Sequence, residues 1–248
     1  MQVPSPPAAA NSQEPTPAER RLAMSFRAYT RRLMSERPGW FPAATPQARA
    51  GVWGRFALWC DELLRASNVP PVFARVELEG IAADMPEGFK ELAKELLKLI
   101  DTPRLMAVGG PRGTGKTMLA SGLVRLFCQC GKPALYRTTK QLMDEVGGVP
   151  WEEKERVRAL HRRQDLLVLD EVQVRDDRAW QDNELTELID ARYRDGKATL
   201  LISNLESEAL KDNLGDSIWR RLIETGGLPI ETDWPRLAEI IASRKAKL

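Results

Sequence analysis

The sequence predicts an α/β protein whose parallel β-sheet is covered by helices on both faces. Short apolar runs alternate with longer amphipathic stretches over most of the chain, which is the order of elements expected of a parallel sheet with crossover helices. The run Leu166–Leu169 is continuously apolar rather than alternating, as is typical of a strand that is buried on both faces. A complete glycine-rich loop also joins one apolar run to one amphipathic stretch, at Gly110–Thr117.

We expect five strands and six helices in this region. Each strand is a short apolar run bounded by polar or turn-forming residues, and each helix is a longer segment with apolar residues at helical spacing. The strands are expected at residues 104–108, 134–137, 166–169, 199–203 and 228–231. The helices are expected at residues 89–99, 116–128, 139–146, 151–161, 182–193 and 217–224.

The N-terminal part of the chain differs in composition. Its first 18 residues hold five of the 17 prolines and too little apolar surface to offset the entropy of ordering, so they are predicted to be disordered. Two helical faces follow, one with Leu22 and Phe26 and the other with Val52 and Phe56. The expected parts are a tail at 1–18, a small helical region at 19–68 and an α/β domain at 69–248.

Composition excludes several classes of protein. Hydrophobic residues make up 43% of the 248 residues, which is enough for a sizeable core without disulfides or a structural metal. No apolar run approaches the roughly 18 residues of a membrane span, so we expect no membrane insertion, and there is no secretory signal pattern. The three cysteines fit no zinc spacing, which favours a reducing cytoplasm.

The charged residues are unevenly distributed. The net charge is +2, but residues 1–70 hold nine arginines and only five acidic residues, while the rest of the chain has a slight acidic excess. Any contact with nucleic acid is therefore expected to be local. The one histidine, His161, excludes a multi-histidine metal site, and we expect it to be an ordinary surface or boundary residue.

The strongest functional signal is the glycine-rich loop, which matches G-x-x-x-x-G-K-[ST] completely. Glycines allow backbone N–H groups to surround an anion, and the following helix adds the partial positive charge of its N-terminus. A chance glycine-rich turn is the alternative, but the strand before the loop and the helix after it disfavour a turn alone. The expected ATP-binding residues are Gly110, Pro111, Arg112, Gly113, Thr114, Gly115, Lys116 and Thr117.

Two carboxylates follow the continuously apolar strand. Ligands of open parallel sheets bind at the carboxyl ends of the strands. Asp170, together with the Thr117 hydroxyl, is therefore expected to hold Mg²⁺, and Glu171 is expected to polarise a water that attacks the γ-phosphate. Strands often end in acidic residues. This pair indicates a metal site only because a complete phosphate loop precedes it in the sequence.

A polar strand end and two arginines complete the candidates. Asn204 follows the strand at 199–203 and could orient the attacking water, although asparagine after a strand is more often part of a turn. An arginine can stabilise transition-state charge, often from a neighbouring subunit. From spacing alone, a solvated or ion-paired role is favoured for Arg220 and Arg221.

Several segments in order carry a resemblance to a known family. They are Val69–Phe73, Gly110–Thr117, Asp165–Val172, Ile189–Tyr193, Ser203–Leu205, Gly215–Leu222 and Asp233–Trp234. Over about residues 69–236 the chain resembles the AAA+ ATPases of the DnaC/IstB type, which are bacterial and phage replicative helicase loaders and transposition helpers. The phosphate loop is generic, whereas the later segments are much more particular to this family.

The resemblance implies an AAA+ α/β/α core with the sheet order 5-1-4-3-2 and with ATP and Mg²⁺ as cofactors. It implies that Asn204 is the sensor of the γ-phosphate and that Arg221 is an arginine finger acting in trans, with Arg220 as the fallback. A full site would then form only between protomers or on a partner. Too few residues follow Arg221 for a C-terminal helical lid, and Arg236 is a poor substitute for a lid arginine.

The resemblance also implies partners. In the family, the helices between the second and third strands line a path for single-stranded DNA, although a mixed-charge solvated helix is the equal alternative here. The N-terminal helices would dock on a hexameric replicative helicase, unless they pack back onto the ATPase core. The DNA-binding candidates are Lys154, Arg156, Arg158, Arg162 and Arg163. The docking candidates are Trp40, Phe41, Trp53 and Trp59.

The favoured function is an ATP-hydrolysing helicase loader. An IstB-like transposition helper belongs to the same class. An adaptor that binds ATP with little turnover belongs to another class, and the presence of Glu171 and Asn204 disfavours it. A metabolic P-loop kinase would need an acceptor-binding lid, which the sequence does not show.

Overall fold

The computed structural model describes residues 46–76, 78, 85–176, 178–227 and 229–245. The predicted tail and the first predicted helix lie outside these residues. The described part contains a five-stranded parallel sheet in the order β2-β3-β4-β1-β5, so the expected AAA+ fold and its 5-1-4-3-2 sheet are confirmed. The strands are β1 Leu105–Gly109, β2 Ala134–Thr138, β3 Leu166–Asp170, β4 Ala198–Ile202 and β5 Ile230–Glu231.

The helices include all six that the sequence predicts. Two helical segments were missed: residues 207–214, which form the first part of α8, and α9. Gly215 has a φ of 77° and kinks α8. The apolar residues before and after the kink therefore do not follow one helical spacing, and the sequence predicted only the part after it. The helices are α2 Pro46–Ala66, α3 Glu87–Lys98, α4 Lys116–Gln129, α5 Thr139–Gly147, α6 Trp151–Arg162, α7 Arg178–Arg194, α8 Ser207–Glu224 and α9 Leu237–Lys245, with a 3₁₀ turn at Pro71–Phe73.

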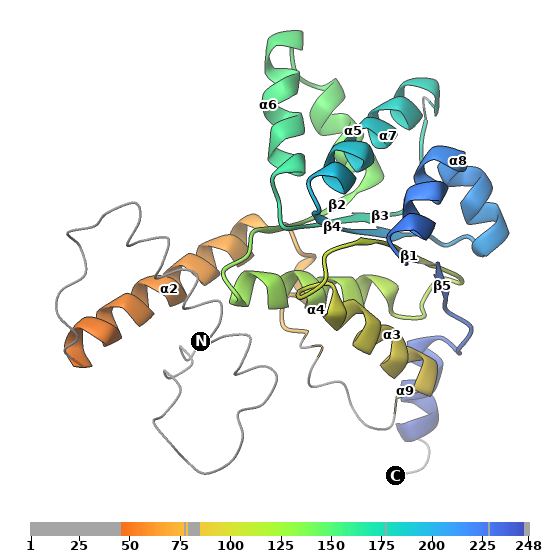
Figure 1. Cartoon of the computed structure of the whole chain (residues 1–248). Helices are drawn as coiled ribbons and strands as arrows, with labels where there is room; N and C mark the ends of the chain where they lie inside the picture. Colours follow the sequence, from red (N-terminus) through yellow and green to blue (C-terminus); the bar gives the residue numbers. More distant parts are fainter. Residues whose placement is uncertain (1–45, 77, 79–84, 177, 228, 246–248) are drawn as a thin grey trace.

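Helices cover both faces of the sheet. The helices α3 and α4 lie against one face, and α5, α7 and α8 lie on the other (Figure 1). In β1, Met106 and Val108 belong to the first core cluster, while Leu105 and Ala107 belong to the second. Alternate residues of a strand point to opposite faces, so a strand with two covered faces must be apolar throughout. Among the described residues, no helix is long and apolar enough to span a membrane.

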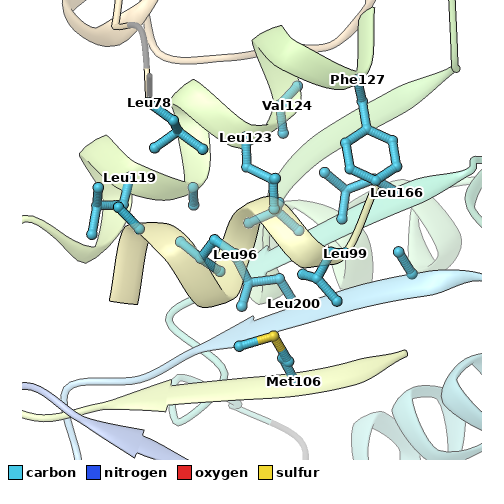
Figure 2. Close-up of a cluster of buried hydrophobic side chains, with 14 of the residues drawn as sticks. Leu78, Leu96, Leu99, Met106, Leu119, Leu123, Val124, Phe127, Leu166 and Leu200 are labelled. Carbon is cyan, nitrogen blue, oxygen red and sulfur yellow. The ribbon is translucent and has the colours of Figure 1, made fainter. Parts of the chain in front are cut away.

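The first cluster holds the phosphate-loop helix in place. Leucines of α3 and α4 interdigitate above the sheet, where Met106 of β1 and Leu200 of β4 lie beneath them (Figure 2). Leu96, Leu119 and Leu123 are each at most 1% exposed. Burial of one such side chain stabilises the fold by about 1.5–3 kcal/mol, so α4 is anchored along its length.

The helix α2 packs on α4 at its C-terminal end. Phe56 is 1% exposed, and a Cβ on Gly131 would lie 2.8 Å from its ring. Trp59 donates its indole N–H to the carbonyl of Gly131 over 3.3 Å. For this end of α2, the structure therefore agrees with the alternative in which the N-terminal region packs onto the core.

Arg192 ties the end of α6 to the sheet. Its side chain is fully buried and lies within 3.0 Å of the carbonyl oxygens of His161, Arg162 and Gln164, to which its guanidinium donates. It also donates to the hydroxyl of Thr199 over 2.9 Å. The last carbonyls of a helix lack partners within the helix, and the guanidinium satisfies them here.

The expectation for His161 was wrong, because this residue is fully buried between α5 and α6. Its Nδ1 lies 2.9 Å from the carbonyl oxygen of Val157, and its Nε2 lies 3.0 Å from a carboxylate oxygen of Glu145. Burial holds the pKa of His161 below its usual value. The sequence of α6 is mostly polar, and nothing in it marks His161 as the residue of this helix that is fully buried.

We predict that Arg192→Met destabilises the fold by about 3–5 kcal/mol, because it leaves several buried carbonyls without a donor. Urea unfolding followed by circular dichroism measures the change. Arg194→Met, two residues along α7 and exposed, should change the free energy of unfolding by no more than about 0.5 kcal/mol. Equal effects of the two substitutions would show that Arg192 has no special structural role.

Candidate functional site

The loop between β1 and α4 has a backbone that only glycine adopts easily. Gly110, Gly113 and Gly115 have φ values of 112°, 85° and 95°. A Cβ on Gly110 would lie 2.5 Å from the hydroxyl of Thr232, so the loop has no room for a side chain there. Because α4 begins at Lys116, the positive end of its dipole lies at this loop. The loop therefore has the shape and the charge of an anion-binding cradle.

Lys116 places a cation inside this cradle. Its side chain is buried, and its ammonium donates to the carbonyl oxygens of Gly110 and Pro111, each over 2.6 Å. Burial lowers the pKa of Lys116, while the nearby carboxylate of Asp170 acts in the opposite direction. The ammonium is held by neutral carbonyls rather than by an ion pair, so its charge is not cancelled within the loop.

Oxygen atoms suited to a magnesium ion meet beside the lysine. The hydroxyl of Thr117 donates to Oδ2 of Asp170 over 2.7 Å. That oxygen also accepts from the hydroxyl of Tyr136 over 2.6 Å, and Oδ1 accepts from the N–H of Glu171 over 2.7 Å. A hydroxyl and a carboxylate next to a phosphate cradle are the protein ligands that Mg²⁺ takes in such sites. The donor set fits a magnesium–nucleotide complex.

Glu171 has an unusual backbone conformation. Its φ is 55°, in the left-handed region that is uncommon for residues other than glycine. Holding a residue there costs of order 1–3 kcal/mol, and such strain clusters at functional sites. The conformation is fixed on both sides, by the N–H bond to Asp170 and by the bond from the N–H of Val172 to the carbonyl of Ile202.

Eight of the predicted residues line one cleft of about 450 Å³ at the carboxyl ends of the strands, whereas Gly110, Pro111 and Thr114 of the loop do not contribute to its lining. Three apolar side chains that the sequence did not single out, Phe73, Met118 and Leu237, also line it and could cover a purine base. Phe73 lies in one of the segments that carry the family resemblance, but its spacing alone assigns it no role. The predicted residues in the lining are Arg112, Gly113, Gly115, Lys116, Thr117, Asp170, Glu171 and Asn204.

The segment after β5 braces the phosphate loop, which the sequence did not predict. The indole N–H of Trp234 donates to the carbonyl of Thr114 over 2.8 Å, and the hydroxyls of Thr232 and Thr114 lie 2.9 Å apart. The N–H of Leu237 donates to the carbonyl of Gly113 over 2.9 Å. Trp234 packs edge-on against Phe89 of α3 at 5.8 Å between ring centroids. The C-terminal segment thus fixes the loop from outside.

Gln173 is a second residue that no sequence signal marks. Its side-chain oxygen accepts from the hydroxyl of Ser203 over 3.0 Å and from the N–H of Asn204 over 3.4 Å. It therefore joins the segment after the acidic strand to the end of β4. This contact fixes the backbone of Asn204 at the edge of the cleft.

Arg221 does not line the cleft. Its guanidinium forms an ion pair with the carboxylate of Asp190, with N–O distances of 2.6 Å, and also bonds to Ser217. The side chain is only 15% exposed, whereas that of Arg220 is 68% exposed and lies 3.8 Å from Glu224. Within one chain, the guanidinium of Arg221, the expected arginine finger, is therefore already paired with Asp190.

The five DNA-binding candidates on and after α6 differ in their surroundings. Arg158 is held by the buried carboxylate of Glu184, with two bonds of 2.7 and 2.8 Å. Lys154 lies 5.9 Å from the ring centre of Trp180, and Arg162 pairs with the nearby Glu155 over 2.9 Å. The remaining two, Arg156 and Arg163, are exposed and make no ion pair with another described residue.

We predict that Trp234→Phe weakens ATP binding several-fold, because it keeps the ring packing but removes one hydrogen bond worth about 1 kcal/mol to the phosphate loop. Titration with a fluorescent ATP analogue measures this affinity. Trp219→Phe is the matched control, since Trp219 packs on the other core cluster. Unchanged affinity in Trp234→Phe would show that the C-terminal segment does not support the loop.

Comparisons with known proteins identify the family to which the chain is similar. Residues 62–223, more than half of the chain, match the model of the family described as IstB-like ATP binding protein. The uncharacterized protein YdaV of Escherichia coli K12 is 24% identical over 183 residues, which cover 70% of this chain and 72% of YdaV. The replicative helicase loader DnaC of Buchnera aphidicola subsp. Schizaphis graminum is 26% identical over 129 residues, covering 50% of this chain and 52% of DnaC.

The fold is similar to that of a solved replication protein. The replication initiator DnaA bound to AMPPCP and single-stranded DNA has a TM-score of 0.59 and 21% identity, over 73% of this chain and 56% of DnaA. The chain thus spans about half the length of the DnaC and DnaA proteins it matches. With its AAA+ fold, its phosphate cradle and the match over residues 62–223, the chain belongs to the family of IstB-like ATP binding proteins.

Proposed function

We propose that this chain is an ATP-hydrolysing loader of a hexameric replicative DNA helicase, with Mg²⁺ as its metal and single-stranded DNA as a further partner. One observation carries the proposal of hydrolysis. The cleft brings Lys116, Thr117 and Asp170 together with Glu171 and Asn204, although they come from three separate segments of the chain. A site for nucleotide binding alone would need only the first three.

Each residue has a part that its position supports. The loop N–H groups and Lys116 would hold the phosphates, and Lys116 would stabilise charge on the γ-phosphate. Thr117 and Asp170 would hold Mg²⁺, which when bound neutralises charge on the phosphate oxygens. Glu171 would orient and polarise the attacking water, and Asn204 would fix that water or the γ-phosphate from the end of the neighbouring strand β4.

The arginine finger is proposed to act between protomers. Arg221 would have to leave Asp190 to reach a neighbouring site, so the isolated chain should turn over slowly. Arg220 on the same helix is exposed and is the alternative finger. The internal ion pair is also the observation that favours the second candidate function, an adaptor that binds ATP with little turnover.

Relatives support the choice of partners. One is named a replicative helicase loader, and one similar structure is a replication initiator bound to single-stranded DNA. Arg156 and Arg163 are the basic residues of the α6 region that remain available for phosphate contacts. A transposition helper shares the same ATPase chemistry, and the family description fits it equally well.

We predict that Glu171→Gln lowers the rate of ATP hydrolysis at least 100-fold while ATP still binds, because the amide cannot accept a proton from the water. Phosphate release is measured for the chain alone, with single-stranded DNA, and with the hexameric replicative helicase of its host. The wild-type rate should rise when DNA or helicase is added.

Glu208→Gln, an exposed change on α8, is the matched control and should keep the wild-type rate. Equal rates for wild type and Glu171→Gln under all three conditions would contradict the proposal that the chain hydrolyses ATP. They would favour an adaptor that binds ATP with little turnover. A wild-type rate that responds to neither DNA nor helicase would contradict the loader.

A further inference from the structure

Tyr136 connects the magnesium-binding carboxylate to a part of the chain outside the cleft. It lies in β2, its side chain is buried, and it belongs to the core cluster beneath α4. Its hydroxyl donates to Oδ2 of Asp170 over 2.6 Å. Tyr136 does not line the cleft, so its effect on a bound nucleotide would be indirect, through the carboxylate of Asp170 to which it donates.

The hydroxyl helps to fix the orientation of the carboxylate. Three donors surround Asp170: the hydroxyls of Thr117 and Tyr136 on Oδ2 and the N–H of Glu171 on Oδ1. An ionised carboxylate can only accept hydrogen bonds, so the hydroxyl of Tyr136 acts here as a donor. Groups that orient a metal ligand commonly change metal affinity by 10–100-fold when they are removed.

The main chain of Tyr136 holds the segment that follows α2. Because β2 is an edge strand, one side of its backbone is free to pair with this segment. The N–H of Tyr136 donates to the carbonyl of Ser67 over 2.8 Å, and its carbonyl accepts from the side-chain amide of Asn68 over 3.3 Å. Asn68 has a φ of 58°, a left-handed conformation that asparagine tolerates better than most residues.

We propose that Tyr136 is a positioning residue that couples the C-terminal end of α2 to the Mg²⁺ site, through its hydroxyl on Asp170 and its main chain on Ser67 and Asn68. The inference rests on the proposed function, since it concerns the same metal site. A partner that moves the end of α2 would shift β2 and loosen the carboxylate. By linkage, Mg²⁺–ATP would in turn hold the end of α2 in place.

The test measures binding of a fluorescent ATP analogue over a series of Mg²⁺ concentrations and in EDTA. Tyr136→Phe keeps the apolar ring and removes only the hydroxyl, so the Mg²⁺ concentration for half-maximal binding should rise about tenfold. Affinity in EDTA should stay at the wild-type value. A role in folding alone would lower both affinities together.

Asn68→Gly tests the connection to α2 and does not depend on whether Tyr136→Phe folds. Glycine keeps the left-handed backbone but removes the bond to the Tyr136 carbonyl, so the required Mg²⁺ concentration should rise roughly threefold or more, because β2 is then held less firmly beside Asp170. Tyr193→Phe removes an exposed hydroxyl that bonds to Glu224, and it should leave the Mg²⁺ dependence unchanged.

The outcomes separate this inference from the proposed function. A wild-type Mg²⁺ dependence in Tyr136→Phe would overturn the positioning role. The same result in Asn68→Gly would overturn the coupling to α2. A wild-type chain that does not bind the analogue at all would instead contradict the nucleotide site itself.

Discussion

The hydrogen bond between Thr117 and Asp170 is the contact on which the whole site depends. It joins the first turn of α4 to the end of β3, and hence the phosphate cradle to the acidic strand end. The bond can form only because both elements are fixed by burial. The strand β3 has apolar neighbours on both faces, and the leucines of α4 lock that helix over the sheet. Core packing therefore sets the geometry of the chemistry.

Sequence reasoning predicted the parts of the fold and the site that are encoded locally. The phosphate loop is a continuous pattern, and Asp170 and Glu171 directly follow a strand that its composition identifies. The sheet order came from the family resemblance rather than from periodicity. Among the described residues, the expected elements and their order agree with the structure, apart from the first part of α8 and α9, which were not predicted.

Contacts between distant segments could not be predicted. Tyr136, Gln173 and Trp234 each act through hydrogen bonds to residues 30 or more positions away. His161 resembles its polar neighbours in sequence and is nevertheless buried. In the segment Ile189–Tyr193, Arg192 caps the end of α6 and Asp190 pairs with Arg221. This segment contributed to the family resemblance, and in the structure these two residues stabilise the fold. These roles follow from tertiary packing, which one sequence does not reveal.

We propose that the cleft is a Mg²⁺-dependent ATP site in which Lys116 holds the phosphates. Isothermal titration of the full chain with a non-hydrolysable ATP analogue, in Mg²⁺ and for both wild type and Lys116→Ala, tests this most directly. We expect the wild type to bind the analogue and Lys116→Ala to bind it at least 100-fold more weakly, because the substitution removes a buried charge from the phosphate cradle. Normal affinity in Lys116→Ala, with its melting temperature unchanged, would contradict the account.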